Sequence, residues 1–292
     1  MKRQRRRDIV LFMLPTVLII TVFLYFPVIL NFVNSLFQWS AFSTQRRFVG
    51  AANYIKMFGD EVFRTAIFNN LVFMAVSVVF QIGLSLVMAA ALEEKFMRRF
   101  QPFFRTVYFL PSLLMVTVTG IMFQIIYNPL IGLVNPLLEL LGLDASGVDL
   151  LGSASSAIWA VVAVSQWQYI GYTLILFLVA MQNIPAQLYE AAELDGVGPV
   201  RKFFSITLPQ IREMLMVNMI VTMTGSIKVF DEVWVMTGGG PGRATETLGS
   251  MLYRAGFRND EMGYASAVAF FVFLVTSLIA IFQIKHYDLK TD

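Results

Sequence analysis

The chain contains no cysteine and only one histidine, and these two shortages exclude several kinds of site. Without cysteine there is no disulfide and no thiolate metal ligand. His286 has no second His or Cys with which to share a metal, so we interpret it as a solvated residue of the tail. A phosphate-binding loop is missing as well, because Gly238-Gly-Gly-Pro-Gly-Arg243 has neither the lysine nor the preceding strand that such a loop needs. We therefore expect no catalytic centre and no ATP hydrolysis by this chain alone.

Charged residues are also scarce, whereas apolar residues are abundant. Only 14% of the 292 residues are charged and 57% are apolar, while ordinary globular proteins have roughly 25% charged residues. Six apolar runs have about the 20 residues that cross a bilayer as a helix. They are Ile9–Val33, Ala66–Leu92, Val107–Tyr127, Ala157–Met181, Met214–Phe230 and Tyr264–Ile284. The first run is too long for a signal peptide and has no small-residue cleavage site. The sequence thus predicts an all-α integral membrane protein with six transmembrane helices in a lipid bilayer.

The basic residues between the runs predict the orientation of the chain. With the amino terminus inside, 14 of the 22 Lys and Arg residues lie in inner segments and seven in outer segments. Cytoplasmic loops carry an excess of Lys and Arg. We therefore expect both termini, and the segment between the fourth and fifth runs, in the cytoplasm.

That inner segment, residues 185–209, has the pattern of two short helices joined by a turn. Pro185 suits the first position of a helix over Ala186–Asp195, and Gly196 suits a left-handed stop. A second short helix can run from Pro199 to Pro209. Neither helix reaches the roughly 12–15 residues that are marginally stable alone in water, so both must pack on something. An interfacial helix pair on the lipid headgroups is one interpretation. A docking site for a partner protein fits better, since small alanines flank an acidic residue there.

Polar residues inside two consecutive runs predict a lined pathway. Those of the fourth run share one helical face, and those of the fifth run recur at every fourth residue. They are Ser165, Gln168, Tyr169 and Tyr172, followed by Asn218, Thr222 and Ser226. Hydrogen bonds between helices would also explain such residues. Because hydroxyls, amides and rings prevail without a carboxylate, we expect a neutral polyhydroxylated ligand.

Other polar residues in the runs have simpler interpretations. Lys228 precedes Asp231 and Glu232 by three and four residues, which predicts a local ion pair at a helix end. Ser77, Gln81 and Ser85 of the second run are expected to support packing. Glycine at position 225 would let a neighbour approach closely.

The motifs then resemble a known family. Glu190-Ala-Ala-x-x-x-Gly196, followed by Ile206-x-Leu208-Pro209, is similar to the EAA signature of ABC importer permeases. Further stretches resemble the carbohydrate-uptake branch, of the type of the larger maltose permease and the glycerol-phosphate permease. These stretches are Phe103-Phe-Arg-Thr-Val-Tyr-Phe-Leu-Pro111, Asn183-Ile-Pro-Ala-Gln-Leu-Tyr-Glu-Ala-Ala192, Phe230-Asp-Glu-Val-Trp-Val-Met-Thr-Gly-Gly-Gly-Pro-Gly242, Ala244-Thr-Glu-Thr-Leu248 and Gly263-Tyr-Ala-Ser-Ala267. The resemblance covers the chain from about Arg46 to its end.

The resemblance implies a type I importer permease core that works in a larger assembly. The implied partners are a second homologous permease, two ATPase subunits and an extracytoplasmic sugar-binding protein, with no nucleic acid. ATP and Mg would bind to the ATPases, and no cofactor to this chain. The implied location is the plasma (inner) membrane of a bacterium or archaeon. Residues 1–65 would form an amino-terminal helix and first outer loop, and residues 66–285 the permease core.

The resemblance also assigns roles to individual residues. In the family the 185–209 segment is the coupling helix, which fits a cleft of the ATPase. The coupling residues implied here are Glu190, Ala191, Ala192, Asp195, Gly196, Arg201, Phe203 and Pro209. The substrate-binding positions implied are Ser112, Ser165, Gln168, Tyr169, Thr222, Ser226 and Val229, of which five were already selected by periodicity. Residue types at these positions largely differ from those of the maltose permease, whose extra amino-terminal spans and large outer domain have no counterpart here.

Three functions remain open from the sequence. The first is an ABC importer permease for a sugar, with an oligosaccharide as the expected cargo. The second is a stand-alone secondary carrier or facilitator for a polyhydroxylated solute, although such carriers usually place an acidic residue or His in mid-membrane. The third is a receptor or scaffold that transports nothing.

Overall fold

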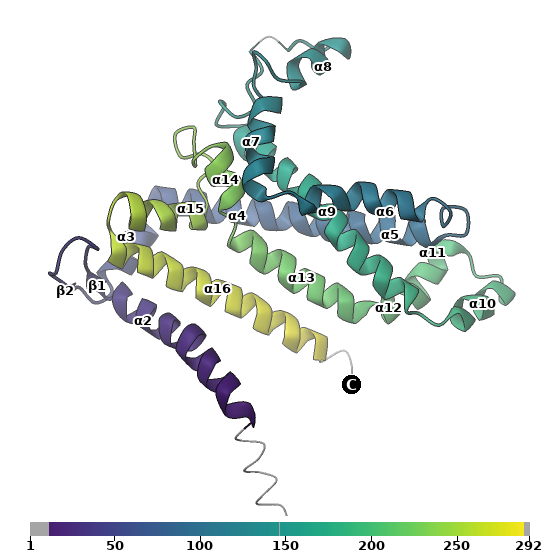
Figure 1. Ribbon diagram of the computed structural model, residues 1–292, viewed down its shortest axis with the longest axis horizontal. Helices are drawn as coiled ribbons and strands as arrows, with labels where there is room; N and C mark the ends of the chain where they lie inside the picture. Colours follow the sequence, from purple (N-terminus) through teal and green to yellow (C-terminus); the bar gives the residue numbers. More distant parts are fainter. Residues whose placement is uncertain (1–11, 146, 289–292) are drawn as a thin grey trace, which may run out of the picture. The chain divides into compact units, whose positions relative to one another are not determined.

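The computed structural model describes residues 12–145 and 147–288, and its regular structure there is helical apart from one hairpin (Figure 1). Residues 12–20 are α-helical and continue into η1 (Thr21–Tyr25). The next helices are α2 (Phe26–Ser35), α3 (Ala52–Gly59), α4 (Glu61–Ser77), η2 (Val78–Leu84), α5 (Ser85–Glu93), α6 (Gln101–Phe109), η3 (Leu110–Leu113), α7 (Val116–Ile126) and α8 (Val134–Leu140). The remaining helices are α9 (Ala157–Gln182), α10 (Ala186–Leu194), α11 (Pro199–Lys202), η4 (Phe203–Thr207), α12 (Leu208–Gln210), α13 (Arg212–Ile227), α14 (Asp231–Met236), α15 (Leu248–Tyr253), η5 (Arg254–Arg258) and α16 (Met262–Asp288). The strands are β1 (Phe37–Gln38) and β2 (Arg47–Phe48).

The long apolar helices confirm the helical membrane fold. In the described part of the chain five of them are long and apolar enough to cross a bilayer, and there are six if a bent pair of helices is counted as one span. The five are Phe12–Ser35, Glu61–Glu93, Ala157–Gln182, Arg212–Met236 and Met262–Tyr287. Each contains one of the predicted runs in whole or in large part, while residues 9–11 of the first run lie outside the described part of the chain.

The third span is broken, which the apolar run Val107–Tyr127 did not reveal. Its halves, Gln101–Leu113 and Val116–Ile126, are bent by 96°. Pro111 lies in the tight turn η3, and Leu114 and Met115 are extended, with ψ of 140° and 136°. Proline cannot continue the helical hydrogen-bond ladder, and two extended residues end it. The expectation of one uninterrupted helix is therefore wrong at this point.

The fifth span is interrupted as well. Helix α13 ends at Ile227, and α14 starts at Asp231 after a short non-helical link. The carbonyl groups at the end of α13 would lack partners inside the helix. Asn70 of α4 supplies them, because its Nδ2 donates to the carbonyls of Ser226 (2.6 Å) and Ile227 (3.2 Å).

The chain divides into two compact units. Unit 1 consists of Met1–Phe63 and Met251–Val275, and unit 2 of Arg64–Ser250 and Thr276–Asp292. In unit 1, β1 and β2 pair antiparallel with Phe37 opposite Phe48. The side chain of Asn53 on α3 donates to the carbonyls of Ser35 (2.7 Å) and Phe37 (3.0 Å), which ties α2 and the hairpin to α3.

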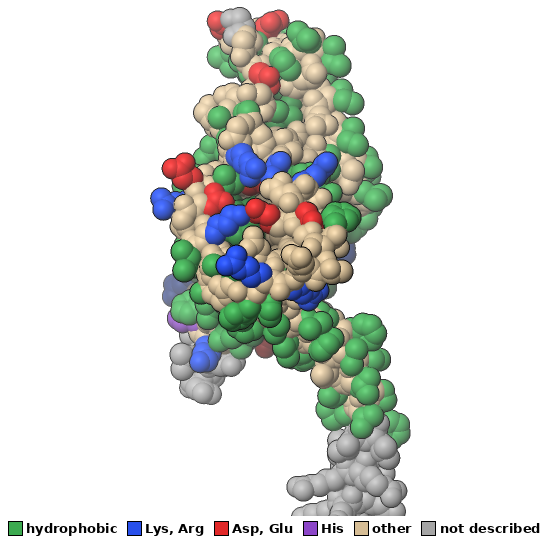
Figure 2. Space-filling model, turned by 90° about the vertical axis from the view of Figure 1, so that its left-hand side faces the viewer, with side chains coloured by type: hydrophobic (Ala, Val, Ile, Leu, Met, Phe, Trp, Pro, Cys, Tyr) green, Lys and Arg blue, Asp and Glu red, His purple; other side chains and the backbone are tan. Residues whose placement is uncertain are grey.

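One end of unit 1 is polar, and its first span is not. Figure 2 looks at the end that carries the hairpin and shows basic and acidic side chains gathered there. In this unit Lys56 pairs with Glu261 at 2.8 Å. By contrast, none of the most apolar window of Phe12–Ser35 is buried. A helix that is hydrophobic all round needs lipid or another membrane helix beside it.

Helix α9 forms the centre of unit 2. Buried residues make up 61% of its most apolar window, against 28% or less for the other four long helices. Leu174, Phe177 and Leu178 are fully buried against α5 and the start of α13. Gly171 permits the closest approach, since a Cβ there would lie 1.7 Å from the carbonyl oxygen of Tyr108 on α6. Unit 2 is thus packed around α9, with the polar face of this helix directed into a cavity.

Candidate functional site

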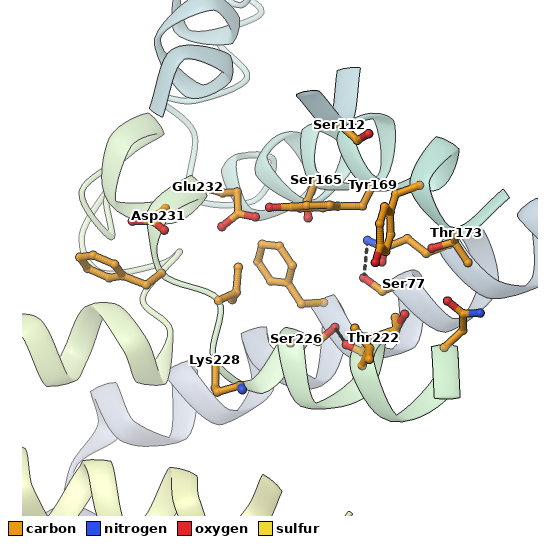
Figure 3. Close-up of a pocket in the computed structure, with 18 residues that line it drawn as sticks. Ser77, Ser112, Ser165, Tyr169, Thr173, Thr222, Ser226, Lys228, Asp231 and Glu232 are labelled. Carbon is orange, nitrogen blue, oxygen red and sulfur yellow. Dashed lines mark hydrogen bonds between the residues drawn. The ribbon is translucent and has the colours of Figure 1, made fainter. Parts of the chain in front are cut away.

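Unit 2 contains a cavity of about 500 Å³ inside its membrane-spanning helices. Figure 3 shows its lining, to which α4, η2, η3, α9, α13 and the link before α14 all contribute. These elements are far apart in the sequence, so the cavity exists only once the spans have packed. Its size falls within the roughly 300–1,000 Å³ that is usual for small-molecule sites.

Six of the seven residues implied as substrate-binding line this one cavity. They are Ser112, Ser165, Tyr169, Thr222, Ser226 and Val229. Tyr172, Asn218 and Gly225 line it as well. The structure therefore brings the two polar stripes together, and their contact with a substrate stays a prediction.

Gln168 is the seventh, and it does not line the cavity. Only 1% of it is exposed, and its Nε2 donates to the carbonyl oxygen of Leu114 at 3.0 Å. That carbonyl belongs to the break in the third span, where helical partners are missing. The structure thus gives Gln168 the role of holding the broken span against α9.

The cavity hydroxyls are held in place by their own helices. Ser226 donates from Oγ to the carbonyl of Thr222 at 2.8 Å, and the Asn218 amide donates to the carbonyl of Met214 at 2.9 Å. Each oxygen keeps accepting capacity, because a hydroxyl or amide oxygen has two lone pairs. These groups can therefore accept hydrogen bonds from a polyhydroxylated ligand without leaving their positions.

Two residues of the second span line the cavity, although we expected them only to support packing. Ser77 and Gln81 line it, and Ser77 Oγ accepts hydrogen bonds from Gln81 (3.3 Å) and from Gln166 of α9 (3.2 Å). Ser85 does support packing, since its Oγ donates to the carbonyl of Ile170 at 2.8 Å. Position 225 differs from expectation, because a Cβ there would meet nothing within 4 Å and the glycine opens onto the cavity.

Charged residues also line the cavity, although the polar stripes contained none. Asp231, Glu232 and Lys228 all contribute, and Glu232 is only 7% exposed. Among residues 12–145 and 147–288, Lys228 forms no ion pair with either acid, so the expected local pair is wrong. The spacing of three and four residues pairs side chains only on a continuous helix, and this helix ends at Ile227.

Two asparagines of α4 that the sequence interpretation missed tie this helix to later parts of unit 2, and Asn70 among them holds the end of α13 at the cavity. Asn69 donates to the carbonyls of Ala244 and Glu246, both at 2.8 Å. Asn70, fully buried, also accepts from the backbone N–H of Leu248 at 2.9 Å through Oδ1. Adjacent asparagines within an apolar run are the signal that could have revealed them, since buried amides are expensive unless they are hydrogen-bonded.

The 185–209 segment has the predicted two-helix form. Helix α10 ends in a Schellman motif, with Gly196 N–H donating to Glu193 (3.1 Å) and Val197 N–H to Ala192 (2.9 Å). Gly196 has φ +69°, which confirms its left-handed stop. Pro185 lies one position before the helix, at its N-cap. The second helix extends through α11, η4 and α12, with Pro209 inside α12, and the chain turns at Ile211.

The residues implied for coupling are mostly on the surface of this segment. Ala192 is buried, and Phe203 is half-buried and packs against the core of unit 2. The exposed residues are Glu190, Ala191, Asp195, Gly196, Arg201 and Pro209. Large apolar side chains are exposed beside them, with Leu194 at 91% and Phe204 at 61%. Contact with an ATPase stays a prediction for all eight.

Ion pairs connect the segment to the end of the second span. Glu193 of α10 contacts Lys95 at 2.8 Å and Lys202 of α11 at 3.6 Å. The hydrogen bond and charge of Glu193 raise the pKa of Lys95, and those of Lys95 lower the pKa of Glu193. Tyr189 and Thr207 share a further hydrogen bond of 2.8 Å. The segment is therefore fixed internally while its outer face stays free.

A second carboxylate joins three spans beneath that segment. Glu93, at the end of α5, accepts hydrogen bonds from Gln101 of α6 (2.7 Å) and Gln182 of α9 (2.9 Å). Arg98 pairs with the same carboxylate at 3.4 Å. The ends of α5, α6 and α9 are thus linked through this one carboxylate.

Membrane-spanning helices, a polar cavity between them and a short amphipathic segment at their ends are the features of a membrane transport subunit. The comparisons with known proteins agree. Residues 81–288 match the family described as "Binding-protein-dependent transport system inner membrane component". The chain belongs to this family, and it is a multi-pass membrane permease subunit.

Relatives extend over nearly the whole chain. The probable ABC transporter permease YurN of Bacillus subtilis is 46% identical over 277 residues, covering 95% of this chain and 94% of YurN. The multiple sugar-binding transport permease MsmF of Streptococcus mutans is 31% identical, covering 94% and 93%. Among solved structures, a bacterial ABC transporter that imports the acidic polysaccharide alginate has a similar chain, with a TM-score of 0.84, 23% identity and 99% of both chains covered. The fold is therefore that of an ABC importer permease.

Proposed function

We propose that this chain forms one half of the pathway by which an ABC importer takes up a sugar, with an oligosaccharide as the expected cargo. The observation that carries the proposal is the cavity of about 500 Å³, lined by hydroxyl, amide and aromatic side chains from several spans. Such groups bind the hydroxyls and the apolar ring faces of saccharides. The names of relatives support a sugar, since MsmF belongs to a multiple sugar-binding system.

The chain works with a second homologous permease, two ATPase subunits and an extracytoplasmic sugar-binding protein. The family description names a binding protein. The alginate transporter was also solved with its periplasmic protein bound to an alginate pentasaccharide. The unburied first span, Phe12–Ser35, offers an apolar surface to lipid or to another membrane helix. The binding protein would dock on the loops that the positive-inside rule assigns to the outer side.

The 185–209 segment transmits the movement of the ATPases, which bind ATP and Mg and hydrolyse the ATP. Its exposed Leu194 and Phe204, beside the small Ala191, form a surface that needs a partner. The substrate site faces alternate sides as ATP closes the ATPases, because nucleotide and loaded binding protein favour different states of one two-state assembly. Both termini and this segment then lie in the cytoplasm.

Single cysteines test the docking role directly, because the chain has none of its own. Leu194→Cys on α10 is expected to cross-link to the ATPase in the assembled importer. Leu140→Cys on α8, which is 81% exposed, is the matched control and should not. A cross-link to the ATPase from position 140 but not from 194 would contradict the assignment.

A cavity-filling substitution tests the pathway. Gly225→Leu is expected to lower sugar uptake at least about tenfold, because its side chain enters the open cavity without striking a neighbour. Val217→Leu on the same helix lies outside the cavity lining and serves as control. Full uptake by the Gly225→Leu importer would place the pathway elsewhere.

A further inference from the structure

The cavity of unit 2 contains a pair of acidic side chains that sugar binding alone does not require. Asp231 and Glu232 form the first turn of α14, and both line the cavity. Glu232 is 7% exposed, its carboxylate accepts a hydrogen bond from its own backbone N–H, and no ion pair to it is present in the part of the chain that the structure describes. A carboxylate that is withdrawn from water is unfavourable unless a cation or several hydrogen bonds accompany it. A cationic group on the ligand would supply that partner.

The lysine in the same cavity does not neutralise these acids. Lys228 is exposed and lies outside ion-pair distance of both carboxylates. Figure 3 shows Glu232 on the side of the cavity that carries Ser165 and Tyr169, with Lys228 on the other side. The lining therefore has two carboxylates against one ammonium group, and its field favours positive charge.

A purely structural role at the start of α14 explains Asp231 better than it explains the buried Glu232. Acidic residues in the first turn of a helix are favourable because they face the positive end of the helix dipole. Asp231, which is exposed, can supply that interaction at the surface. Glu232 also accepts the backbone N–H of its own residue in this turn, but one such bond does not satisfy a carboxylate that is buried in the wall of a ligand-sized cavity.

We propose that the cavity selects a saccharide that carries a protonated amino group, and that Glu232 recognises the amine. The inference rests on the proposed sugar pathway and specifies its substrate class. Hydroxyl groups of Ser165, Thr222 and Ser226 bind the sugar hydroxyls, while the Glu232 carboxylate accepts the ammonium hydrogens as a charge-assisted bond. The same field disfavours uronic acids and sugar phosphates of equal size.

The test compares three β-1,4-linked disaccharides of nearly equal size and different charge. They are glucosaminyl-glucosamine, cellobiose and cellobiouronic acid. Binding is measured by calorimetry on the importer in nanodiscs without its binding protein, at a pH where the amine is protonated, so that only the membrane site selects. We expect the amine to bind about tenfold more tightly than cellobiose and the acid to bind most weakly.

Two variants locate the selectivity. Glu232→Gln keeps the size and polarity of the side chain, and it should remove the preference for the amine while cellobiose affinity changes less than about twofold. Glu213→Gln, an exposed acid in the first turn of α13, is the matched control and should preserve the preference. Equal affinity for all three disaccharides, or a Glu232→Gln variant that weakens cellobiose as much as the amine, would overturn the inference alone. Absence of binding by all three would overturn the proposed sugar pathway as well.

Discussion

The cavity and the 185–209 segment are built in opposite ways. The cavity is assembled from distant parts of the chain, and its polar groups are mostly buried and hydrogen-bonded within the protein. The segment folds from one continuous stretch and leaves most of its coupling residues exposed. The difference indicates that the polar lining of the cavity is fixed by packing within this chain, whereas the segment presents a surface that only a partner covers.

The largest effect on transport is expected from breaking the turn of the segment. Gly196→Pro cannot adopt φ +69°, because proline fixes φ near −65°. Sugar-stimulated ATP hydrolysis and uptake should fall at least about tenfold, while membrane insertion and the melting temperature of the spans stay the same. Gly198→Ala, at φ −67°, is the control that should retain activity. Normal transport by Gly196→Pro would show that the turn transmits nothing.

A loss of thermal stability is expected when the helix packing around the cavity is disturbed. Gly171→Ala would place its Cβ 1.7 Å from the carbonyl oxygen of Tyr108. Overpacking of this kind costs about 1–3 kcal/mol, which should lower the melting temperature of the purified importer. Gly225→Ala meets no neighbour within 4 Å and should leave that temperature unchanged or raise it. Equal melting curves for both variants would contradict the close approach of α9 and α6.

A smaller effect is expected from reversing one charge on the exposed face of α10. Glu190→Lys preserves the helix but places a base where the ATPase is proposed to contact an acid. The coupling of ATP hydrolysis to transport should therefore fall severalfold, while the spans stay folded. The ratio of sugar transported to ATP hydrolysed measures this directly. The variant Asp195→Asn, at the end of the same helix, should have less effect because it reverses no charge.

The local form of the segment was predictable because its signals are local. Pro185, Gly196 and Pro209 predict where helices start and stop from backbone restrictions alone, and the structure agrees to within about one or two residues, as usual for helix ends. Periodicity similarly placed Ser165 and Tyr169 on one face of α9. Nothing in these patterns depends on which helix lies opposite.

The assembled parts of the site were less predictable. An apolar run does not reveal that Leu114 and Met115 are extended, and this break draws Gln168 out of the cavity. The link after Ile227 likewise separates Lys228 from Asp231 and places Glu232 in the cavity wall. Both breaks depend on partners from other helices, such as Asn70, and therefore on tertiary packing.

The smallest effect is expected at the ion pair of Lys95 and Glu193. Both side chains are largely exposed, at 82% and 42%, and exposed pairs contribute little. Because the pKa of Glu193 is lowered in the folded state, the pair stabilises the fold above the pKa of the unfolded carboxyl. This stabilisation is lost as the pH falls through the pKa of the folded carboxyl. The pKa of Lys95 is raised, so its contribution to stability is fully present below the pKa of the unfolded lysine. That contribution is lost as the pH rises through the pKa of the folded lysine. Glu193→Gln should therefore change transport less than about twofold, with no pH dependence near neutrality. A large loss would show that this pair transmits the movement.

ATP-dependent uptake in liposomes distinguishes a subunit of an ATP-driven importer from a carrier that works by itself. The complete importer, with its second permease, ATPases and loaded binding protein, should accumulate sugar only when ATP is present on the ATPase side. This chain alone should transport nothing, because its cavity has no source of energy and the 185–209 segment has no partner. Robust uptake by the isolated chain without ATP would contradict the account and identify a carrier that works by itself.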